Sequence, residues 1–401
     1  MVPRVVVTGL GAVSALGPDV ETFWTALAGG RSGLRALEEV PGGASNTRIG
    51  GQVPNFTPAQ HFPADLLPLL DRHSQFAIVA ARQAVADAGL SRDDLGTAAA
   101  IVGTGCGGKE TDEQTYARLY REGRKRAHPL TIPRGMPSAA SSQVSMQLGI
   151  QGPVFTVSSA CASSNHAVAQ AAMMIRAGLV DVAIAGGADA PFTHGLLKAW
   201  EAMRVMSGDT CRPFSADRSG LVLGEGAGMV VLESEERALR RGARIHAELA
   251  GFGMSADAGH ITDPSVDGAV RAMTAALADA RVSPDQVAYV NAHGTGTRAN
   301  DVAESRALRQ VFGRHADALA VSSTKSMHGH ALGAAGGLEL VATVRAIAAG
   351  LAPGTANFTR PDPDCDLDYL PNRARAMEIP VAISNSFAFG GLNAVLVVRA
   401  V

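Results

Sequence analysis

Short runs of β-branched and apolar residues, each ending at a glycine or another small residue, alternate in this chain with alanine-rich stretches. Apolar runs without polar alternation are typical of strands that are covered on both faces. Nine such runs are expected to form strands: Val5–Thr8, Ala99–Gly103, Val154–Val157, Val182–Ala185, Met229–Leu232, Val287–Asn291, Leu319–Ser322, Val381–Ser384 and Ala394–Val398. Five alanine-rich stretches are expected to form helices: Asp71–Ala88, Ser164–Ala177, Gly268–Ala280, Val302–Val311 and Gly336–Ala349. This alternation predicts an α/β layered fold.

A weak internal similarity indicates that the fold is duplicated. Ala98–Gly108 and Ala288–Thr297 both read as a strand that runs into a turn of small residues. The chain of 401 residues is also much longer than one ordinary domain of roughly 150 residues. We therefore expect two similar α/β halves, residues 1–250 and 251–401, that share a tight interface because no low-complexity linker separates them.

Composition excludes several classes of protein. A net charge of −2 gives no basic footprint for binding nucleic acid or a membrane surface. The four cysteines lie far apart without a CxxC pair, which argues against a zinc site or disulfides and favours a cytoplasmic location. The N-terminal residues lack the apolar core of a signal peptide. Gly135–Ile175 has no charged side chain, but polar residues and prolines interrupt it, so we expect core or a subunit interface rather than a membrane span.

The segment Gly9–Ser14 follows a predicted strand and begins like a dinucleotide-binding fingerprint. The third glycine of that fingerprint is missing, and no acidic residue closes a second strand about 20 residues further on. A tight turn between a strand and a helix is therefore the preferred interpretation.

Cys161 is the first candidate for chemistry. In Thr156–Gly178 a β-like run ends, small residues turn the chain, and a helix begins just after Cys161. The positive end of a helix stabilises a thiolate, so this position suits a nucleophile. Free cysteines are also among the most buried residues, so a structural role is an equally good interpretation of this segment alone.

Histidines follow two other predicted strands. His293 lies in the Gly/Thr-rich turn of Asn291–Glu304, and Ser323–Gly337 contains His328 and His330 beside Lys325, one of only four lysines. The spacing does not match a metal-binding helix. Together with Cys161 these strand ends indicate one convergent site, although the residues alone do not choose between His328 and His330. The turn within Ala382–Val398 is polar and rich in glycine, and its backbone N–H groups could form an oxyanion hole.

Taken together, these motifs resemble the β-ketoacyl-acyl-carrier-protein synthases, the condensing enzymes of the thiolase-like superfamily. The resemblance runs from VVVTGLGAVSALG to NSFAFGGLN. Motifs such as SSACASSNHAV and SSTKSMHGHALGAAGG resemble the nodulation and secondary-metabolite branch of the family. It implies a thiolase-like fold with αβαβα layers. It also implies acyl transfer to a cysteine and then decarboxylative condensation with a malonyl-carrier, which gives a 3-oxoacyl product two carbons longer in fatty acid or polyketide biosynthesis.

Site residues follow from the resemblance. Cys161 becomes the nucleophile, and His293 and His330 become the pair that supports malonyl decarboxylation. Lys325 orders the site with Glu339, and the backbone N–H of the gate residue Phe389 joins that of Cys161 in the oxyanion hole. The remaining matched positions contact the substrate: Thr295, Thr297 and Cys106. No redox cofactor is implied, phosphopantetheine belongs to the carrier partner, and some members hold a structural monovalent cation.

Three positions depart from the family pattern. Ala388 replaces the usual glycine before Phe389, which restricts the backbone of the gate. The segment that matches the basic carrier-docking helix, Ala64–Gln75, keeps only Arg72. Either docking falls instead on the basic side chains of a charge-rich, exposed excursion, namely Arg121, Arg124, Lys125 and Arg126, or the carrier is unusual. A solvated face is an equally good interpretation of this basic run. Cys106 stands where relatives often carry a bulkier aliphatic residue, which predicts a roomier acyl pocket.

Two alternatives are less well supported. A thiolase would need a second cysteine near the C-terminus, and NSFAFGGLN has none. A non-catalytic partner subunit would generally have lost the nucleophile, and Cys161 is present with both histidines. We expect a homodimer, while the active half of a heterodimer with a related subunit stays open.

Overall fold

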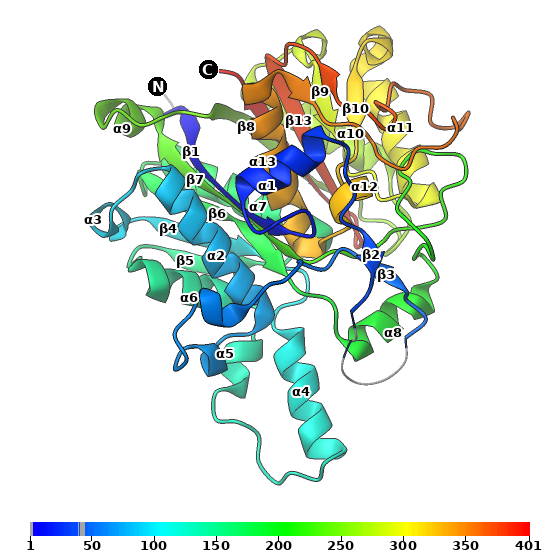
Figure 1. Cartoon of the computed structure of the whole chain (residues 1–401). Helices are drawn as coiled ribbons and strands as arrows, with labels where there is room; N and C mark the ends of the chain where they lie inside the picture. Colours follow the sequence, from blue (N-terminus) through cyan, green and yellow to red (C-terminus); the bar gives the residue numbers. More distant parts are fainter. Residues whose placement is uncertain (1–2, 39, 41–44) are drawn as a thin grey trace.

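The computed structural model describes residues 3–38, 40 and 45–401. Its main feature is one mixed sheet of ten strands in the order β10-β9-β13-β14-β8-β1-β7-β6-β4-β5 (Figure 1). These strands are β1 (Val5–Ser14), β4 (Ala99–Gly103), β5 (Val154–Val157), β6 (Val182–Asp189), β7 (Gly226–Ser234), β8 (Ala247–Ala256), β9 (Tyr289–Asn291), β10 (Ala320–Ser322), β13 (Val381–Ala388) and β14 (Leu392–Arg399). All nine predicted runs lie at least partly in this sheet, and of its ten strands β8 alone was not predicted. Two small two-stranded sheets were not predicted either: β2 (Arg35–Ala36) with β3 (Ile49–Gly50), and β11 (Leu351–Ala352) with β12 (Arg375–Ala376).

The sheet consists of two halves with the same topology. In each half the first strand is innermost, followed outward by the last, fourth, second and third strands of that half. The directions also agree, with two antiparallel pairs and then two parallel pairs in each half. Only two residue pairs join β1 to β8. The duplication is confirmed, whereas the boundary between residues 250 and 251 lies within β8 and stays a prediction.

Helices form three layers around the two half-sheets. On the outer face of the N-terminal half lie α2 (Arg72–Asp87) and α6 (Ala139–Leu148), and on that of the C-terminal half lies α10 (Val266–Ala280) with α11 (Arg298–Phe312) packed on it. Between the halves lie α7 (Ser163–Arg176) and α13 (Ala335–Ala349), which contact strands of both (Figure 1). This arrangement gives the predicted αβαβα order, and the five predicted helices are confirmed.

The central helices are buried on nearly every side. Every residue of α13 from Ala335 to Val344 is buried. The segment Leu332–Ala349, which includes α13, is long and apolar enough to cross a bilayer, yet 78% of it is buried inside the protein. A helix enclosed between two sheets needs the same all-round apolar composition. This composition therefore follows from its place in the central layer.

The expected turn at Gly9–Ser14 is wrong, because β1 continues through it to Ser14. The glycines serve helix packing instead. A Cβ at Gly9 would lie 2.0 Å from Ala84 O, and one at Gly11 would lie 1.9 Å from Ala80 O. Because both oxygens belong to α2, the absence of side chains lets this helix lie against the strand.

Shorter helices surround the layered core: α1 (Val20–Ala28), α3 (Arg92–Leu95), α4 (Lys109–Tyr120), α5 (Thr131–Gly135), α8 (His194–Met203), α9 (Glu235–Arg240) and α12 (Lys325–His328). The charge-rich excursion is α4 and the loop after it, which project from the body of the molecule (Figure 1). Thr111 is the only buried residue of α4. The prediction that this segment is exposed is confirmed.

Candidate active site

Cys161 lies in a strained turn between β5 and α7. The short 3₁₀ helix η3 (Ala160–Ala162) leads directly into α7. Ala160 has a φ of +49°, in the left-handed region that side-chain-bearing residues seldom adopt. Ser163 Oγ donates a hydrogen bond of 2.6 Å to Ala160 O and helps to hold the turn. Strain of this kind is typical of a functional site, because the surrounding structure must enforce it.

Burial decides the ionisation of the Cys161 thiol. Loss of solvent raises its pKa to about 12, although Lys325 and the backbone N–H of Cys161 itself lower it. The helix end at α7 was expected to stabilise a thiolate, but burial is the largest influence on the pKa and favours the neutral thiol. In the resting protein the thiol is therefore protonated at neutral pH.

One cavity brings most of the predicted residues together. It has a volume of about 370 Å³. The predicted residues that line it are Cys161, His293, Thr295, Thr297, His330 and Phe389. His328 does not line it, since its ring is buried with Nε2 3.0 Å from Thr324 Oγ1. Of the two histidines that the residues alone left open, His330 is the one at the cavity.

Lys325 and Glu339 form a fully buried ion pair behind the histidines. Lys325 Nζ also donates to His293 O over 2.7 Å and lies 3.3 Å from His293 Nδ1. Burial raises the pKa of Glu339 to about 7, while the lysine lowers it. The pair therefore connects α12 and α13 to the turn that carries His293.

Both histidines present the same ring nitrogen to the cavity. An ammonium group has no acceptor, so His293 Nδ1 accepts from Lys325. His330 Nδ1 accepts from the backbone N–H of Leu332 over 3.2 Å. With Nδ1 as the acceptor, the proton of each neutral ring resides on Nε2. The ring centroids are 5.4 Å apart, so two Nε2–H donors can converge on one ligand atom.

The pKa values of both histidines lie well below the ordinary range. Burial is the largest cause, and Lys325 is the second. A neighbouring imidazole is the third cause in each case: His330 lowers the pKa of His293, and His328 lowers that of His330. Both rings are therefore neutral at pH 7.

Sequence reasoning missed Glu304 as a support for His293. Its carboxylate accepts from the backbone N–H groups of His293 and Gly294, both over 2.8 Å, and from Asn385 Nδ2 over 3.0 Å. A signal was present, because Asp301 and Glu304 lie three residues apart on the buried face of α11, directly after the Gly/Thr-rich turn.

The gate turn, Phe389–Gly391, joins β13 to β14 as predicted. The Phe389 ring stacks on Trp200 of α8 with a centroid distance of 6.0 Å. The loop after β8 is bonded to this turn, because Gly390 N donates to Ile261 O over 2.7 Å and Asp257 N donates to Gly391 O over 2.8 Å. This loop also lines the cavity. No sequence motif marked this loop, and β8, the strand before it, was not predicted either.

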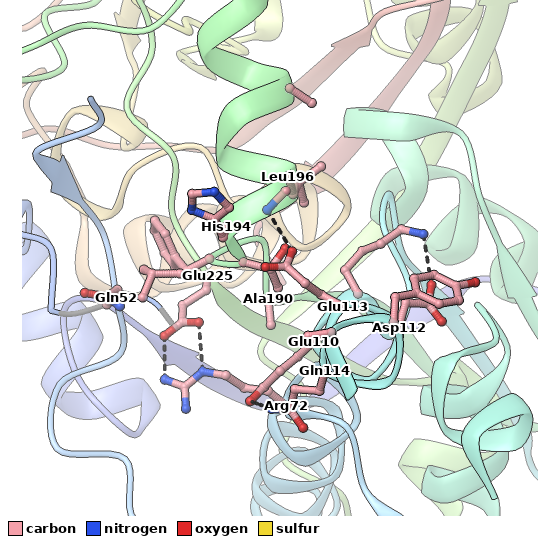
Figure 2. A pocket seen from close by; sticks show the side chains of 18 of the residues that line it. Gln52, Arg72, Glu110, Asp112, Glu113, Gln114, Ala190, His194, Leu196 and Glu225 are labelled. Atoms are coloured by element: carbon pink, nitrogen blue, oxygen red, sulfur yellow. Dashed lines mark hydrogen bonds and ion pairs between the residues drawn. The ribbon is translucent and has the colours of Figure 1, made fainter. Parts of the chain in front are cut away.

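Cys106 does not line the cavity, but it packs against the apolar cluster that contains Cys161. Arg72, the one basic residue left in the expected docking segment, forms an ion pair with Glu225 over 2.6 Å. Figure 2 shows this pair in the wall of a second cavity of about 770 Å³, beside α4 and α8. The pairing makes Arg72 a structural residue of that wall.

Comparison with known proteins agrees with this geometry. Residues 3–238 match the family model described as "Beta-ketoacyl synthase, N-terminal domain", and residues 246–359 match the one described as "Beta-ketoacyl synthase, C-terminal domain". The chain is 51% identical to nodulation protein E of Rhizobium sp. (strain N33), over 99% of each chain. It is 41% identical to 3-oxoacyl-[acyl-carrier-protein] synthase 2 of Synechocystis sp., over 98% of this chain and 97% of that protein.

Solved structures agree as well. The ishigamide ketosynthase/chain length factor has a TM-score of 0.95 at 39% identity, with both chains covered completely. A type II polyketide synthase acyl-carrier protein in complex with its ketosynthase bound to the hexaketide has a TM-score of 0.92 at 35% identity, also with both chains covered completely.

The layered fold and the cavity with one cysteine and two histidines define an acyltransferase of the condensing class with a thiolase-like fold. Such enzymes form carbon–carbon bonds between acyl groups. More particularly, the chain belongs to the β-ketoacyl synthase family.

Proposed function

We propose that this chain joins an acyl group carried on Cys161 to a malonyl unit delivered by an acyl carrier protein. The observation that supports this most is the shared cavity, in which one thiol faces two neutral imidazoles. The carrier as partner is consistent with the name of the Synechocystis relative and with the carrier complex among the solved structures.

In the first step the Cys161 sulfur attacks the thioester carbonyl of an acyl-carrier. The carbon–sulfur bond to the carrier breaks, the carrier thiol leaves with the proton of Cys161, and an acyl-enzyme remains. The backbone N–H groups of Cys161 and Phe389 stabilise the oxyanion of the tetrahedral intermediate. Because the resting thiol is protonated, its proton leaves as the new bond forms.

In the second step a malonyl-carrier enters the same cavity. Its carbon–carboxylate bond breaks, carbon dioxide leaves, and the electron pair remains as an enolate on the thioester. The two Nε2–H groups of His293 and His330 donate to the enolate oxygen. The enolate carbon then attacks the acyl carbonyl, for which the reacting atoms must be held about 3–3.5 Å apart. The carbon–sulfur bond to Cys161 breaks, the Cys161 thiolate takes up one proton from solvent, and the carrier departs with the 3-oxoacyl product.

Thr295 and Thr297 are proposed to contact the pantetheine arm. Both line the cavity, and their hydroxyl oxygens lie 2.9 Å apart. Cys106 is proposed to line the part of the acyl site that is continuous with the apolar cluster around Cys161.

Buried oxygens near Glu339 fit the structural monovalent cation of the family. Asn291 Oδ1, Ser384 Oγ, Ser386 Oγ and Glu339 Oε2 are buried and have no hydrogen-bond partner among the described residues. Asn291 and Ser384 are paired in register on β9 and β13, and α13 packs on β13. Oxygen donors with one carboxylate suit a hard cation. When bound, the cation would supply positive charge next to Glu339.

We propose that the carrier docks on the basic end of the excursion. Arg121, Arg124, Lys125 and Arg126 are all exposed at the end of α4 and in the loop after it. Exposed cations there would steer an acidic partner to the surface. We also propose a cytoplasmic location, because a catalytic thiol must stay reduced and the described cysteines are all free.

We further propose a homodimer through β5. This strand pairs only with β4 in the described structure and ends the sheet. It belongs to the uncharged segment Gly135–Ile175, from which Met146 (59%) and Phe155 (38%) are exposed in the single chain. An unpaired edge beside exposed apolar side chains is typical of a surface that a second copy covers.

The proposal is tested by intact-mass measurement after incubation with an acyl-carrier. We expect one acyl adduct, which is absent in Cys161→Ala and retained in Cys365→Ala, a control at another buried cysteine. Addition of malonyl-carrier should discharge the adduct as a 3-oxoacyl product two carbons longer. An adduct that persists in Cys161→Ala, or no adduct over a series of chain lengths, would overturn the proposed role of Cys161.

A further inference from the structure

We propose that Asp189 is a positioning residue that holds the turn of Cys161 and the turn of His330 in one fixed arrangement. The inference rests on the roles proposed above for these two residues. Asp189 is the last residue of β6 and is fully buried. None of the sequence motifs includes it.

The carboxylate of Asp189 accepts four hydrogen bonds from two separate segments. Oδ1 accepts from Thr104 Oγ1 over 2.7 Å and from Cys106 N over 3.0 Å. Oδ2 accepts from Gly105 N over 2.8 Å and from Gly333 N over 2.6 Å. Two carboxylate oxygens offer about four lone pairs, so every acceptor position is used. The side chain thus joins the loop after β4 to the turn before α13.

One arm of this network leads to His330. Gly333 follows Leu332, whose N–H fixes the His330 ring by donating to Nδ1. Leu332 has a φ of +50°, a strained conformation that needs external support. Asp189 holds Gly333 N, and Ser164 Oγ donates to Gly333 O, so the residue next to Leu332 is held on both sides.

The other arm leads to Cys161. The backbone oxygen of Thr104 lies 3.2 Å from Ser163 Oγ, and the same hydroxyl lies 2.6 Å from Ala160 O. The loop that Asp189 holds through Thr104 therefore lies against Ser163, two residues after Cys161, and its Thr104 N donates over 3.0 Å to Val157 O, before Cys161. The charge of Asp189 also reaches the thiol, because it adds to the burial that raises the pKa of Cys161.

Close packing leaves no space for a substitute arrangement. A Cβ at Gly333 would lie 2.3 Å from Gly105 N, and one at Gly187 would lie 2.3 Å from Ser164 Oγ. The four protein donors already satisfy the Asp189 carboxylate, so it needs no water molecule to complete its hydrogen bonds. An amide at position 189 would turn its NH₂ group toward backbone N–H donors and would leave buried donors unpaired.

The test compares Asp189→Asn with Glu233→Gln in the full-length protein. Glu233 is likewise buried and accepts from Thr8, Arg237 and Arg241, outside the active site. Both variants should lose thermal stability. Only Asp189→Asn should lower kcat for decarboxylation of malonyl-carrier, by roughly tenfold or more, with KM within about twofold. Equal kcat in Asp189→Asn and Glu233→Gln would overturn the inference.

A spectroscopic measurement separates positioning from general loosening. In ¹⁵N-histidine spectra, with signals assigned by His330→Ala, wild-type His330 should show its proton on Nε2. Asp189→Asn should lose this single-tautomer signal for His330 and keep it for His293, because Lys325 and not Asp189 holds the His293 ring. An unchanged His330 signal would overturn the inference.

If Asp189→Asn does not fold, a comparison of Thr104→Val with Thr104→Ser tests the inference instead. Valine removes the hydroxyl bond to Asp189, and serine keeps it. We expect a loss of decarboxylation in the valine variant that serine restores, and equal rates would contradict the inference. The wild-type protein separates this result from the proposed function: no decarboxylation in wild type refutes the function, whereas an active wild type with equally active variants refutes only the role of Asp189.

Discussion

Lys325 is the residue on which the electrostatics of the site depend. It is fully buried and contacts Glu339 and two atoms of His293. After burial, it is the largest cause that lowers the pKa values of His293 and His330. A proton on either ring would have to coexist with this buried cation, so the rings remain neutral donors.

Lys325→Met should therefore shift the acid limb of the pH profile for decarboxylation to higher pH. Without the cation the histidine pKa values rise toward 6.5, the ordinary value, and each ring is protonated at a higher pH than in wild type. As the pH falls, we expect the variant to begin to lose decarboxylation at a higher pH than the wild type, while burial still holds both histidine pKa values below the ordinary value. Lys325→Arg retains the charge and should keep the wild-type profile. Coincident pH profiles for Lys325→Met and the wild type would contradict this role of Lys325.

Cys106→Ile should shorten the acyl chains that the enzyme accepts. The side chain is half-buried against the apolar cluster of Cys161, so a larger group there would occupy acyl space. One methylene in a filled pocket changes discrimination by roughly 10-fold or more, so acylation by the longest accepted chains should fall at least that far. The measurement is the rate of adduct formation over a series of acyl-carriers, with Cys106→Ser as the size-matched control. An unchanged chain-length preference would count against an acyl role.

Residues with a local signature could be predicted from the sequence, and residues held by distant segments could not. Cys161 and His293 each follow a strand and precede a turn or helix, a pattern that a single segment displays, whereas the residues alone left His328 and His330 as alternatives. The carboxylates of Asp257 and Asp189 accept bonds from Asn393 Nδ2 and Gly333 N, each more than 100 residues away. No local pattern distinguishes such carboxylates from ordinary surface acids.

At the scale of elements, paired glycines explain why β8 was not predicted. A Cβ at Gly251 would lie 2.4 Å from Ala280 N, and one at Gly253 would lie 2.1 Å from Ala272 O, both in α10. β1 uses Gly9 and Gly11 against α2 in the same way. Glycine weakens strand propensity, so such a segment resembles a turn until its helix is known. In β1 the run before its glycines, Val5–Thr8, was enough to predict the strand.

Ala388→Gly should loosen the gate without damaging the chemistry. Ala388 ends β13, where glycine costs about 0.5–1 kcal/mol relative to alanine. We expect this loss of stability together with faster reaction of Cys161 with a bulky maleimide. Ala382→Gly lies in the same strand away from the turn and should lose similar stability with no change in labelling. Equal labelling rates for wild type and Ala388→Gly would show that this alanine does not restrict the gate.

At the scale of the whole molecule, Phe155→Glu should separate the proposed dimer. Phe155 is exposed on the unpaired edge strand β5, so two copies that meet there would bury two like charges. A buried unpaired charge costs several kcal/mol, which shifts a micromolar sample toward monomers. Sedimentation velocity measures this change. Leu179→Glu replaces an equally apolar residue that is 69% exposed outside β5 and should leave the dimer intact; a monomeric wild type would refute the interface.

The duplicated topology gives the turn of Cys161 a counterpart in the second half of the chain. Just as η3 precedes α7, the short helix η6 (Leu332–Ala334) precedes α13, and each begins with a residue whose φ is near +50°. Gly333 is therefore the counterpart of Cys161 in the second half. A side chain there would collide with Gly105 N at 2.3 Å and Thr104 C at 2.6 Å. The scaffold is symmetric but has space for a side chain in the first of these turns only, so under the role proposed for Cys161 each chain carries one acyl group.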